Sequence, residues 1–505
     1  MKIRGHWLNR FLMQLTFVGA ISHMQTSSHS VMANDSTAHL RVEISPSLPL
    51  DPLAIQTMAD YDLTLCLYRT WFEYDEGRKA MPGIVSAWQF DDAGGKYIFT
   101  IAPQTKWSDG SPLTSDQLIS NLKRAVYVKK DSFGGAISEI VAIEKAKVLS
   151  STKFELPTRN GKPSESFFQR MGSIFLAPIH PSDFDSNFAI KGNQLSSGPY
   201  KIESITPTQL SLAINTNDGL APKERVSIIA MKRDSVTQLN DFILGKSWAN
   251  ILQTATLMPL SLATQVQAKK LPYWTRGIDR VSRLKPLGTG AKLEERRHFL
   301  VEFGKVWRTL DLGVLSFNAK RALSLQPLGY PLFNELDYGR ARATNGKLLK
   351  SIKIVVRHGP QFEVQRPLIE KAAQALGVKV QWVSVKTYAE SSAAEKADPE
   401  IGFNLISFGV ADPEPATWMG LVLDETGFFS DVEKQDVIEF KKMAAITDKA
   451  KEIAEFKKLL EKMAYRGSYL PLLHFSTLSI GQVGINFNGI KELDETVDYS
   501  KLIVR

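Results

Sequence analysis

The stretch from residue 82 to residue 120 constrains the fold of this chain most, because it specifies three local structures in succession. Apolar residues alternate with polar ones on both sides of the loop 91–96, which predicts a β-hairpin. The dipeptide Asp109-Gly110 predicts a tight turn, since glycine accepts a positive φ. Thr114 and Gln117 have the spacing of a capping box, which predicts that a helix begins here.

These elements, in this order, resemble the signature region of the family 5 extracellular solute-binding proteins. This family comprises the oligopeptide-, dipeptide- and nickel-binding receptors of ABC importers. The residues that match its pattern in order are Pro82, Ile84, Trp88, Tyr97, Phe99, Ile101, Lys106, Trp107, Ser108, Asp109, Gly110, Pro112, Leu113 and Thr114. Those that depart from it are Val85, Ala87, Ala102, Ser115 and Gln117. The resemblance implies an α/β, two-lobed periplasmic-binding-protein fold of type II, in its large variant, with an additional small α+β domain.

A chain of 505 residues is too long for one simple core, so we expect about two or three lobes. No low-complexity linker separates them, which favours a chain that crosses between lobes more than once at a hinge. The resemblance implies a discontinuous lobe I, formed by residues 34–56, 180–310 and 473–505. An additional small domain is expected over residues 57–179, and lobe II over residues 311–472.

The N-terminus has the pattern of a signal peptide over residues 1–33. Basic residues precede a mostly apolar segment, 11–21, and Ala33 ends a small-residue cleavage site; cleavage after Ala20 is the alternative. No cysteine lies near either position, so we expect a periplasmic protein without a lipid anchor.

Composition and motifs exclude several classes of function. The net charge is +9, but lysines and arginines are spread along the chain without a nucleic-acid-binding motif, so we expect no nucleic-acid partner. The positive net charge is also compatible with binding to an anionic ligand or an anionic membrane surface. Cys66 is the only cysteine, which rules out an intramolecular disulfide. No P-loop, G-x-S-x-G, H-E-x-x-H or C-x-x-C motif occurs, and no two histidines have ligand spacing. We therefore expect no enzyme, no cofactor and no metal site.

Further along the chain, residues 351–385 read as a βαβ unit whose helix stops at Gly377, which predicts a parallel sheet. A second helix is predicted from a cap at Thr447 or Asp448 through Arg466. Two weaker patterns predict a loop and then a short helix over 284–297, and a strand over 313–319.

The candidate ligand site is the segment 408–418. A predicted strand ends at Phe408 and leads through Ala411 into a turn that carries Asp412, and ligands of open α/β sheets gather at the carboxyl ends of strands. The resemblance implies that Asp412 pairs with the α-amino group of a peptide, and that the preceding backbone binds the peptide as an added strand. This turn is one residue shorter than the family pattern before Pro415. Alternatively, Asp412 only caps the turn that follows.

Three further residues are weaker candidates for ligand binding. Trp418 either lines the cleft or fills the core of its lobe, as a single tryptophan commonly does. Ser45 and Ser47 follow the predicted first strand, in the region where the resemblance places the first lobe against the cleft.

Together these features predict a periplasmic receptor that captures a small ligand, most simply a peptide, between two lobes. Its expected partner is an ABC permease in the inner membrane, and we expect a monomer. The alternative is a sensor or scaffold with an altered cleft, because residues 319–342 do not complete the family's helix motif. A periplasmic hydrolase would require catalytic groups that meet only in space.

Overall fold

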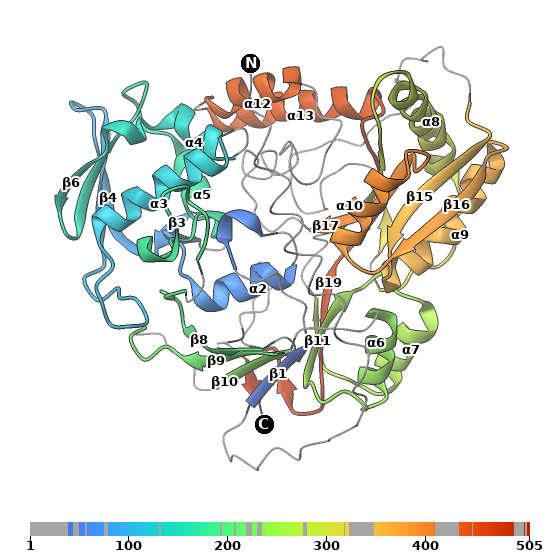
Figure 1. The fold of residues 1–505 in the computed structure, drawn as a ribbon, viewed down its shortest axis with the longest axis horizontal. Coiled ribbons are helices and arrows are strands. Elements are labelled where there is room, and N and C mark those ends of the chain that lie inside the picture. The colour runs from blue at the N-terminus through green and yellow to red at the C-terminus, as the bar shows by residue number, and fades with distance from the viewer. Residues whose placement is uncertain are drawn as a thin grey trace. The chain divides into compact units, whose positions relative to one another are not determined.

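The computed structural model describes residues 39–43, 50–55, 58–74, 79–130, 133–191, 194–206, 209–218, 225–229, 235–275, 280–317, 319–322, 348–409, 434–446, 448–488, 499 and 502–504. The largest sheet has the strand order β12-β19-β11-β1-β10-β9-β8 (Figure 1). Its strands are β1 (His39–Glu43), β8 (Tyr200–Ile205), β9 (Gln209–Ile214), β10 (Arg225–Ile229), β11 (Ile251–Ala255), β12 (Tyr273–Thr275) and β19 (Thr477–Gly481). Strand β1 runs parallel to both of its neighbours. The helices associated with this sheet are α2 (Met58–Leu67), α6 (Ser235–Ile243) and α7 (Leu260–Ala268).

The second sheet has six strands in the order β14-β18-β13-β17-β15-β16. They are β13 (Arg280–Pro286), β14 (Lys320–Arg321), β15 (Ser351–Arg357), β16 (Lys379–Val385), β17 (Phe403–Gly409) and β18 (Leu470–Phe475). The helices on this sheet or beside it are α8 (Gly290–Thr309), α9 (Pro360–Ala375), α10 (Tyr388–Ala397), α12 (Lys434–Ala444) and α13 (Lys449–Tyr465).

Two sequence predictions in this half of the chain are confirmed. Strands β15 and β16 are parallel and are joined through α9, and Gly377 after this helix has a φ of 70°, as a helix-ending glycine should. Asp448 caps α13, because its Oδ1 accepts a hydrogen bond of 2.9 Å from the backbone N–H of Lys451.

A third sheet, of four strands, contains the predicted hairpin and has the order β4-β5-β7-β6. Its strands are β4 (Val85–Asp91), β5 (Lys96–Ile101), β6 (Lys147–Ser150) and β7 (Lys153–Pro157). The helices of this region are α3 (Ser115–Val128), α4 (Phe133–Ile140) and α5 (Glu165–Met171). Two small pairs complete the described strands: β2 (Phe72–Tyr74) with β3 (Ala80–Pro82), and β20 (Ile485–Asn486) with β21 (Ile503–Val504).

The hairpin, the turn and the capped helix all form where the sequence predicts them. Asp109 shapes the turn, since its Oδ1 accepts the backbone N–H of Ser111 at 2.9 Å. Gln117 Oε1 accepts both the Thr114 backbone N–H at 3.0 Å and the Trp107 indole N–H at 2.9 Å. The cap of α3 is therefore also the polar anchor of a fully buried tryptophan.

The side-chain amide of Gln117 also contacts the ring of His180. Because Oε1 accepts two N–H groups, Nε2 is the group that faces His180 Nε2, at 3.2 Å. On the other side of the ring, Nδ1 faces Ser182, whose Oγ and backbone N lie 2.6 and 3.2 Å away.

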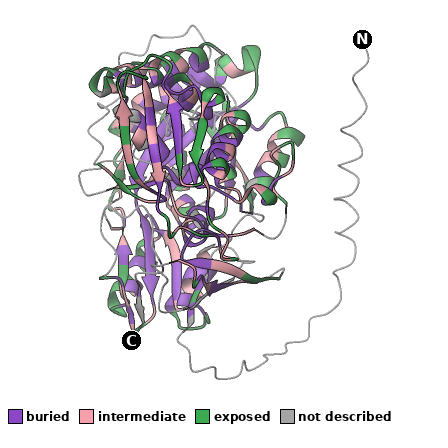
Figure 2. Cartoon of the chain, turned by 90° about the vertical axis from the view of Figure 1, so that its left-hand side faces the viewer, coloured by how far each residue is buried: buried purple, intermediate pink, exposed green. Residues whose placement is uncertain are grey.

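Among the residues that the structure describes, the buried apolar side chains form separate clusters. One large cluster joins the four-stranded sheet to α2, β1 and β9, and another joins the six-stranded sheet to α8, α9, α12 and α13. A smaller cluster lies between α6, α7 and β11. Figure 2 shows buried strands beside helices whose outer surfaces are exposed. The division into lobes and the lobe boundaries stay a prediction.

The structure corrects two of the weaker predictions. The loop and short helix expected over 284–297 form with other extents, because β13 continues to Pro286, only residues 287–289 are a loop, and the helix that begins at Gly290 continues to Thr309. The first turns of α8 are rich in charged residues, so the sequence there does not show the buried apolar stripe of its later turns, which contains Phe299, Phe303 and Trp307. Both elements belong with the six-stranded sheet, although their residues fall in the span predicted for lobe I.

The strand expected over 313–319 does not form in the described part of that segment. Gly313 and Phe317 have φ values of 64° and 50°, and an extended strand requires negative φ. The described residues after it form β14, whose Lys320 and Arg321 pair with β18.

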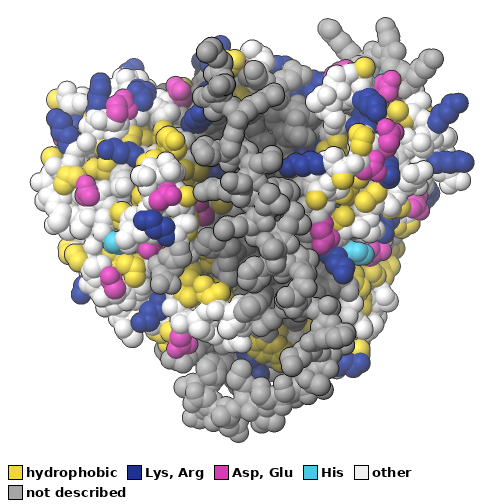
Figure 3. All heavy atoms as spheres, in the orientation of Figure 1, with side chains coloured by type: hydrophobic (Ala, Val, Ile, Leu, Met, Phe, Trp, Pro, Cys, Tyr) yellow, Lys and Arg dark blue, Asp and Glu magenta, His cyan; other side chains and the backbone are white. Residues whose placement is uncertain are grey.

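The surface of the described chain carries mixed charge. On the face drawn in Figure 3, lysine and arginine side chains lie interspersed with acidic ones and do not form one continuous patch. Within the residues that the structure describes, no helix is long and apolar enough to cross a membrane. Nor do three or more histidine, cysteine or acidic side chains gather there as metal ligands.

Candidate ligand site at the crossover between the sheets

The chain passes between the seven-stranded and the six-stranded sheet at two places close to each other. Strand β18 ends at Phe475 and β19 begins at Thr477, so that Ser476 alone joins strands of the two sheets. Strand β12 ends at Thr275 in one sheet, and β13 begins at Arg280 in the other. Arg280 Nε donates to Thr477 Oγ1 at 2.9 Å, which ties the second passage to the first.

A compact set of polar side chains surrounds these passages, and we call it the crossover cluster: Thr256, Arg280, Ser316, Ser476 and Thr477. Ser476 N donates to Thr256 Oγ1 at 2.8 Å, and Thr256 N donates to Ser476 O at 2.8 Å. Ser316 Oγ donates to Thr256 O at 2.8 Å. All except Arg280 are buried. Because these hydrogen bonds are buried and mutually supporting, they hold the two passages in a defined geometry.

Of the strands that lead to the predicted ligand residues, β17 ends beside this cluster, and β1 runs parallel to β11, which leads into it. Phe408 lies in β17 opposite Val281, and Gly409, the last residue of β17, lies opposite Arg280. Strand β1 ends at Glu43 beside β11, which runs on to Ala255 and the crossover cluster. The carboxyl ends of β17, β1 and β11 thus lead toward one region, as expected for ligand sites in open α/β sheets.

The remaining predicted site residues lie outside the described part of the chain. Ala411, Asp412 and Trp418 follow β17, and Ser45 and Ser47 follow β1. Only Phe408 is therefore placed by the structure, and only through its position in the backbone pairing of β17.

A buried polar group on α2 faces the same sheet. Asp62, 1% exposed, accepts a hydrogen bond from the Gln253 side chain of β11 at 2.5 Å. Burial raises the pKa of Tyr499 well above its ordinary value, and the neighbouring carboxylate of Asp62, to which it is hydrogen-bonded, adds to this rise. A protonated tyrosine therefore donates to Asp62 throughout the physiological pH range.

Sequence reasoning missed the crossover cluster and two buried cations of β13. Arg283 and Lys285 are 0% and 5% exposed, and both have interaction partners in the structure. The signal available for the cluster was the run of Ser476, Thr477 and Ser479 within an otherwise apolar segment, where small hydroxyl side chains need partners once buried. No comparable local signal exists for Thr256 or Ser316.

Comparison with known proteins shows which proteins this chain resembles in sequence. Residues 79–279 match the model of the bacterial extracellular solute-binding proteins, family 5 middle. Over 91 residues the chain is 30% identical to the probable deoxycholate-binding periplasmic protein YgiS of Escherichia coli strain K12. That alignment covers 18% of this chain and 17% of YgiS.

Solved structures resemble the chain over nearly its whole length. The Escherichia coli murein tripeptide binding protein MppA has a TM-score of 0.74 at 13% identity, covering 92% of this chain and 98% of MppA. Haemophilus influenzae OppA in complex with RPPGFSPFR also has a TM-score of 0.74, at 12% identity, covering 93% of this chain and 99% of OppA. The predicted α/β periplasmic-binding-protein fold is confirmed. The chain is therefore similar in sequence to the family 5 extracellular solute-binding proteins over residues 79–279, and similar in fold to MppA over 92% of its length.

Proposed function

We propose that this protein is a periplasmic receptor that captures a peptide between its two lobes and delivers it to an ABC permease in the inner membrane. The observation that carries the proposal is the convergence of the carboxyl ends of β17, β1 and β11 on the crossover cluster. The predicted ligand segments follow β17 and β1 directly in the chain. Binding at such a junction lets one ligand contact both lobes, so that closure of a hinge traps it.

Peptide is the ligand class that the comparisons favour. One similar structure is that of a murein tripeptide binding protein, and another contains RPPGFSPFR, which is a peptide in one-letter code. A peptide added as an extra strand is held mainly by backbone hydrogen bonds, which tolerate varied side chains. A carboxylate in the position of Asp412 would then set the register by pairing with the terminal ammonium group.

Native mass spectrometry of the protein tests this proposal. The full chain is expressed, purified from the periplasmic fraction, and its mass is recorded before and after denaturation. We expect an intact mass consistent with cleavage after Ala33 and the release of a heterogeneous set of short peptides. A single discrete non-peptide mass contradicts the peptide proposal and identifies the ligand instead. Absence from the periplasmic fraction contradicts the receptor role.

A sensor or scaffold without an import role is the second candidate. The observation that favours it is that Lys320 and Arg321, where the family's helix motif begins, form the short strand β14 and not a first helical turn. A protein purified without any ligand, which also shows no thermal shift with a panel of short peptides, would support this candidate.

Replacing Asp412 by alanine is expected to weaken binding of trialanine, measured by calorimetry, by about 2–5 kcal/mol. The reason is that the terminal ammonium group of the peptide loses its buried counterion. N-acetylated trialanine has no such charge, so its affinity should change by less than about 0.5 kcal/mol. Asp92→Ala, in an exposed turn, is the matched control and should alter neither. Equal losses for the two peptides would refute the role of Asp412 as the anchor.

A further inference from the structure

One guanidinium group joins two parts of the chain that are far apart in sequence. Arg170, on α5, forms an ion pair with Glu452 in the first turn of α13, 282 residues away. Its Nη1 atom donates to Ala444 O, at the end of α12, at 2.9 Å and to Ala136 O, on α4, at 3.0 Å. The side chains of Arg170 and Glu452 are 1% and 0% exposed. A single residue therefore connects three helices through contacts that exclude water.

The apolar neighbours of the two partners belong to different core clusters. Beside Arg170, Phe167 and Phe168 pack with Tyr97 of the four-stranded sheet. Beside Glu452, Phe456 packs with Phe440 in the core of the six-stranded sheet. The ion pair thus spans the surface where α4 and α5 contact α12 and α13, and Figure 1 shows α12 and α13 extending across to α4.

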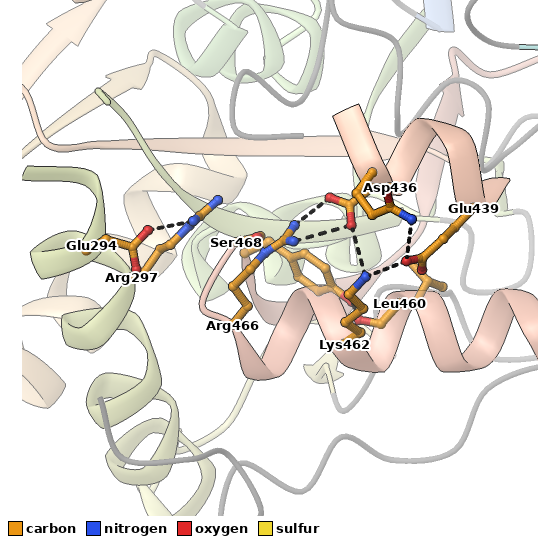
Figure 4. Close-up of polar contacts among 10 residues, drawn as sticks. Glu294, Arg297, Asp436, Glu439, Leu460, Lys462, Arg466 and Ser468 are labelled. Atoms are coloured by element: carbon orange, nitrogen blue, oxygen red, sulfur yellow. Dashed lines mark hydrogen bonds and ion pairs between the residues drawn. The ribbon is translucent and has the colours of Figure 1, made fainter. Parts of the chain in front are cut away.

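On the Glu452 side of this contact, ion pairs hold α12 and α13 together (Figure 4). Arg466, just after α13, binds both carboxylate oxygens of the fully buried Asp436 on α12, at 3.3 and 2.6 Å. Lys462 adds a contact of 2.8 Å to Glu439. Because α12 and α13 are clamped together in this way, Glu452 moves with the six-stranded sheet as one body.

We propose that the Arg170–Glu452 pair is a latch that sets the balance between open and closed forms of the protein before any ligand binds. Near the crossover cluster the chain itself joins the seven-stranded sheet to the six-stranded sheet. A hinge at this point can therefore change the angle between the two sheets but cannot separate them there. At α5 and α13, by contrast, the part with the four-stranded sheet and the part with the six-stranded sheet are held by non-covalent contacts. Opening of the protein must therefore break the Arg170–Glu452 pair. The proposal rests on the proposed function in one respect, namely that opening admits the ligand.

The chemistry of a buried ion pair suits a reversible latch. Burying both charges costs hydration, and their attraction offsets this cost, so the net stabilisation of the closed form is small. When the halves separate, each charge regains water. Removal of one partner, by contrast, takes this attraction away from the other charge, which is buried in the closed form only. Single substitutions should therefore favour opening, while replacement of both residues by apolar ones should restore closure.

Single-molecule fluorescence energy transfer on the ligand-free protein tests the latch directly. Cys66, the only cysteine, is replaced by alanine, and fluorophores are attached at Asp92→Cys and Lys379→Cys. Both positions are exposed: Asp92 lies in the turn between β4 and β5 of the four-stranded sheet, and Lys379 begins β16 of the six-stranded sheet. The short-distance population measures the closed form, and no ligand needs to be known.

The variants are Glu452→Gln, Arg170→Met and the double variant Arg170→Met with Glu452→Leu. We expect each single change to lower the closed-to-open ratio at least about tenfold, and the double change to restore it. The control is Arg159→Met, in an ion pair with Glu144 whose side chains are 43% and 56% exposed, and it should leave the ratio unchanged. If Arg170→Met does not fold, the closed-to-open ratio of the isosteric Glu452→Gln variant is compared with that of the unchanged protein.

Two outcomes would overturn the latch. Single variants that unfold at lower temperature but keep the parental distance distribution would show a permanent structural contact. A double variant as open as the single variants would show that charge desolvation does not control closure. Because neither outcome involves a ligand, the latch and the peptide-receptor proposal stand or fall separately.

Discussion

Replacing Trp107 by alanine is expected to lower the free energy of unfolding by about 3–5 kcal/mol, measured by urea denaturation. The side chain is 0% exposed, its ring contacts the His180 ring edge-on at 5.1 Å, and its indole N–H is bound by Gln117. Alanine would leave a large cavity under the hairpin and remove one of the two donors that orient the Gln117 amide. The effect should therefore extend to the cap of α3.

Two further variants separate the causes of this loss. Trp107→Phe retains most of the apolar volume but has no N–H, so about 1–2 kcal/mol of loss is expected from the hydrogen bond and altered packing. Trp248→Ala is the matched control, because this tryptophan is 42% exposed and lies against Arg41 only as a cation–π pair, and about 1 kcal/mol or less is expected. Equal losses for Trp107→Ala and Trp248→Ala would contradict the scaffold role of Trp107.

Replacing Asp436 by alanine is expected to destabilise the protein by about 3 kcal/mol, toward the lower end of the range for a broken buried ion pair. Asp436 is 0% exposed and is the shared partner of Arg466 and Lys462. Arg466, with 17% of its side chain exposed, retains some contact with water, which moderates the cost of its lost partner. Urea denaturation and hydrogen exchange across α12 and α13 would measure the global and the local effect.

Glu439→Ala is the control for this prediction, because it lies on the same helix and shares Lys462. Its side chain is 27% exposed and that of Lys462 is 45% exposed, so a loss below about 1 kcal/mol is expected. A loss from Asp436→Ala no larger than this would mean that α12 and α13 are held by their apolar contacts alone. In that case Glu452 would lack the rigid support on which the latch depends.

The features that were predicted correctly depend on interactions between residues close in the chain. The cap at Asp448 involves an N–H of Lys451, and the turn at Asp109 involves Ser111. Gly377 ends α9 because its own backbone needs a positive φ. In each case the partner lies within a few residues, so spacing in the sequence carries the full information.

Errors arose where the environment, rather than the local pattern, decided the structure. Arg283 and Lys285 interrupt the apolar pattern of β13, so the segment that begins at Leu284 reads as a loop. In the structure this strand lies between β17 and β18 and both cations have partners, which makes their burial possible. Such pairing cannot be inferred from neighbouring residues in the chain.

The sequence by itself determined the family resemblance, the fold class and the local elements of residues 82–120, because these follow from short-range patterns. It also directed attention to Asp412, which stays a prediction. Only the tertiary structure decided which distant residues meet: Ser476 with Thr256, 220 residues apart, and Arg170 with Glu452, 282 residues apart. The physical reason is that hydrogen bonds and ion pairs act over a few ångströms in space, and only the folded chain brings these residues within that range.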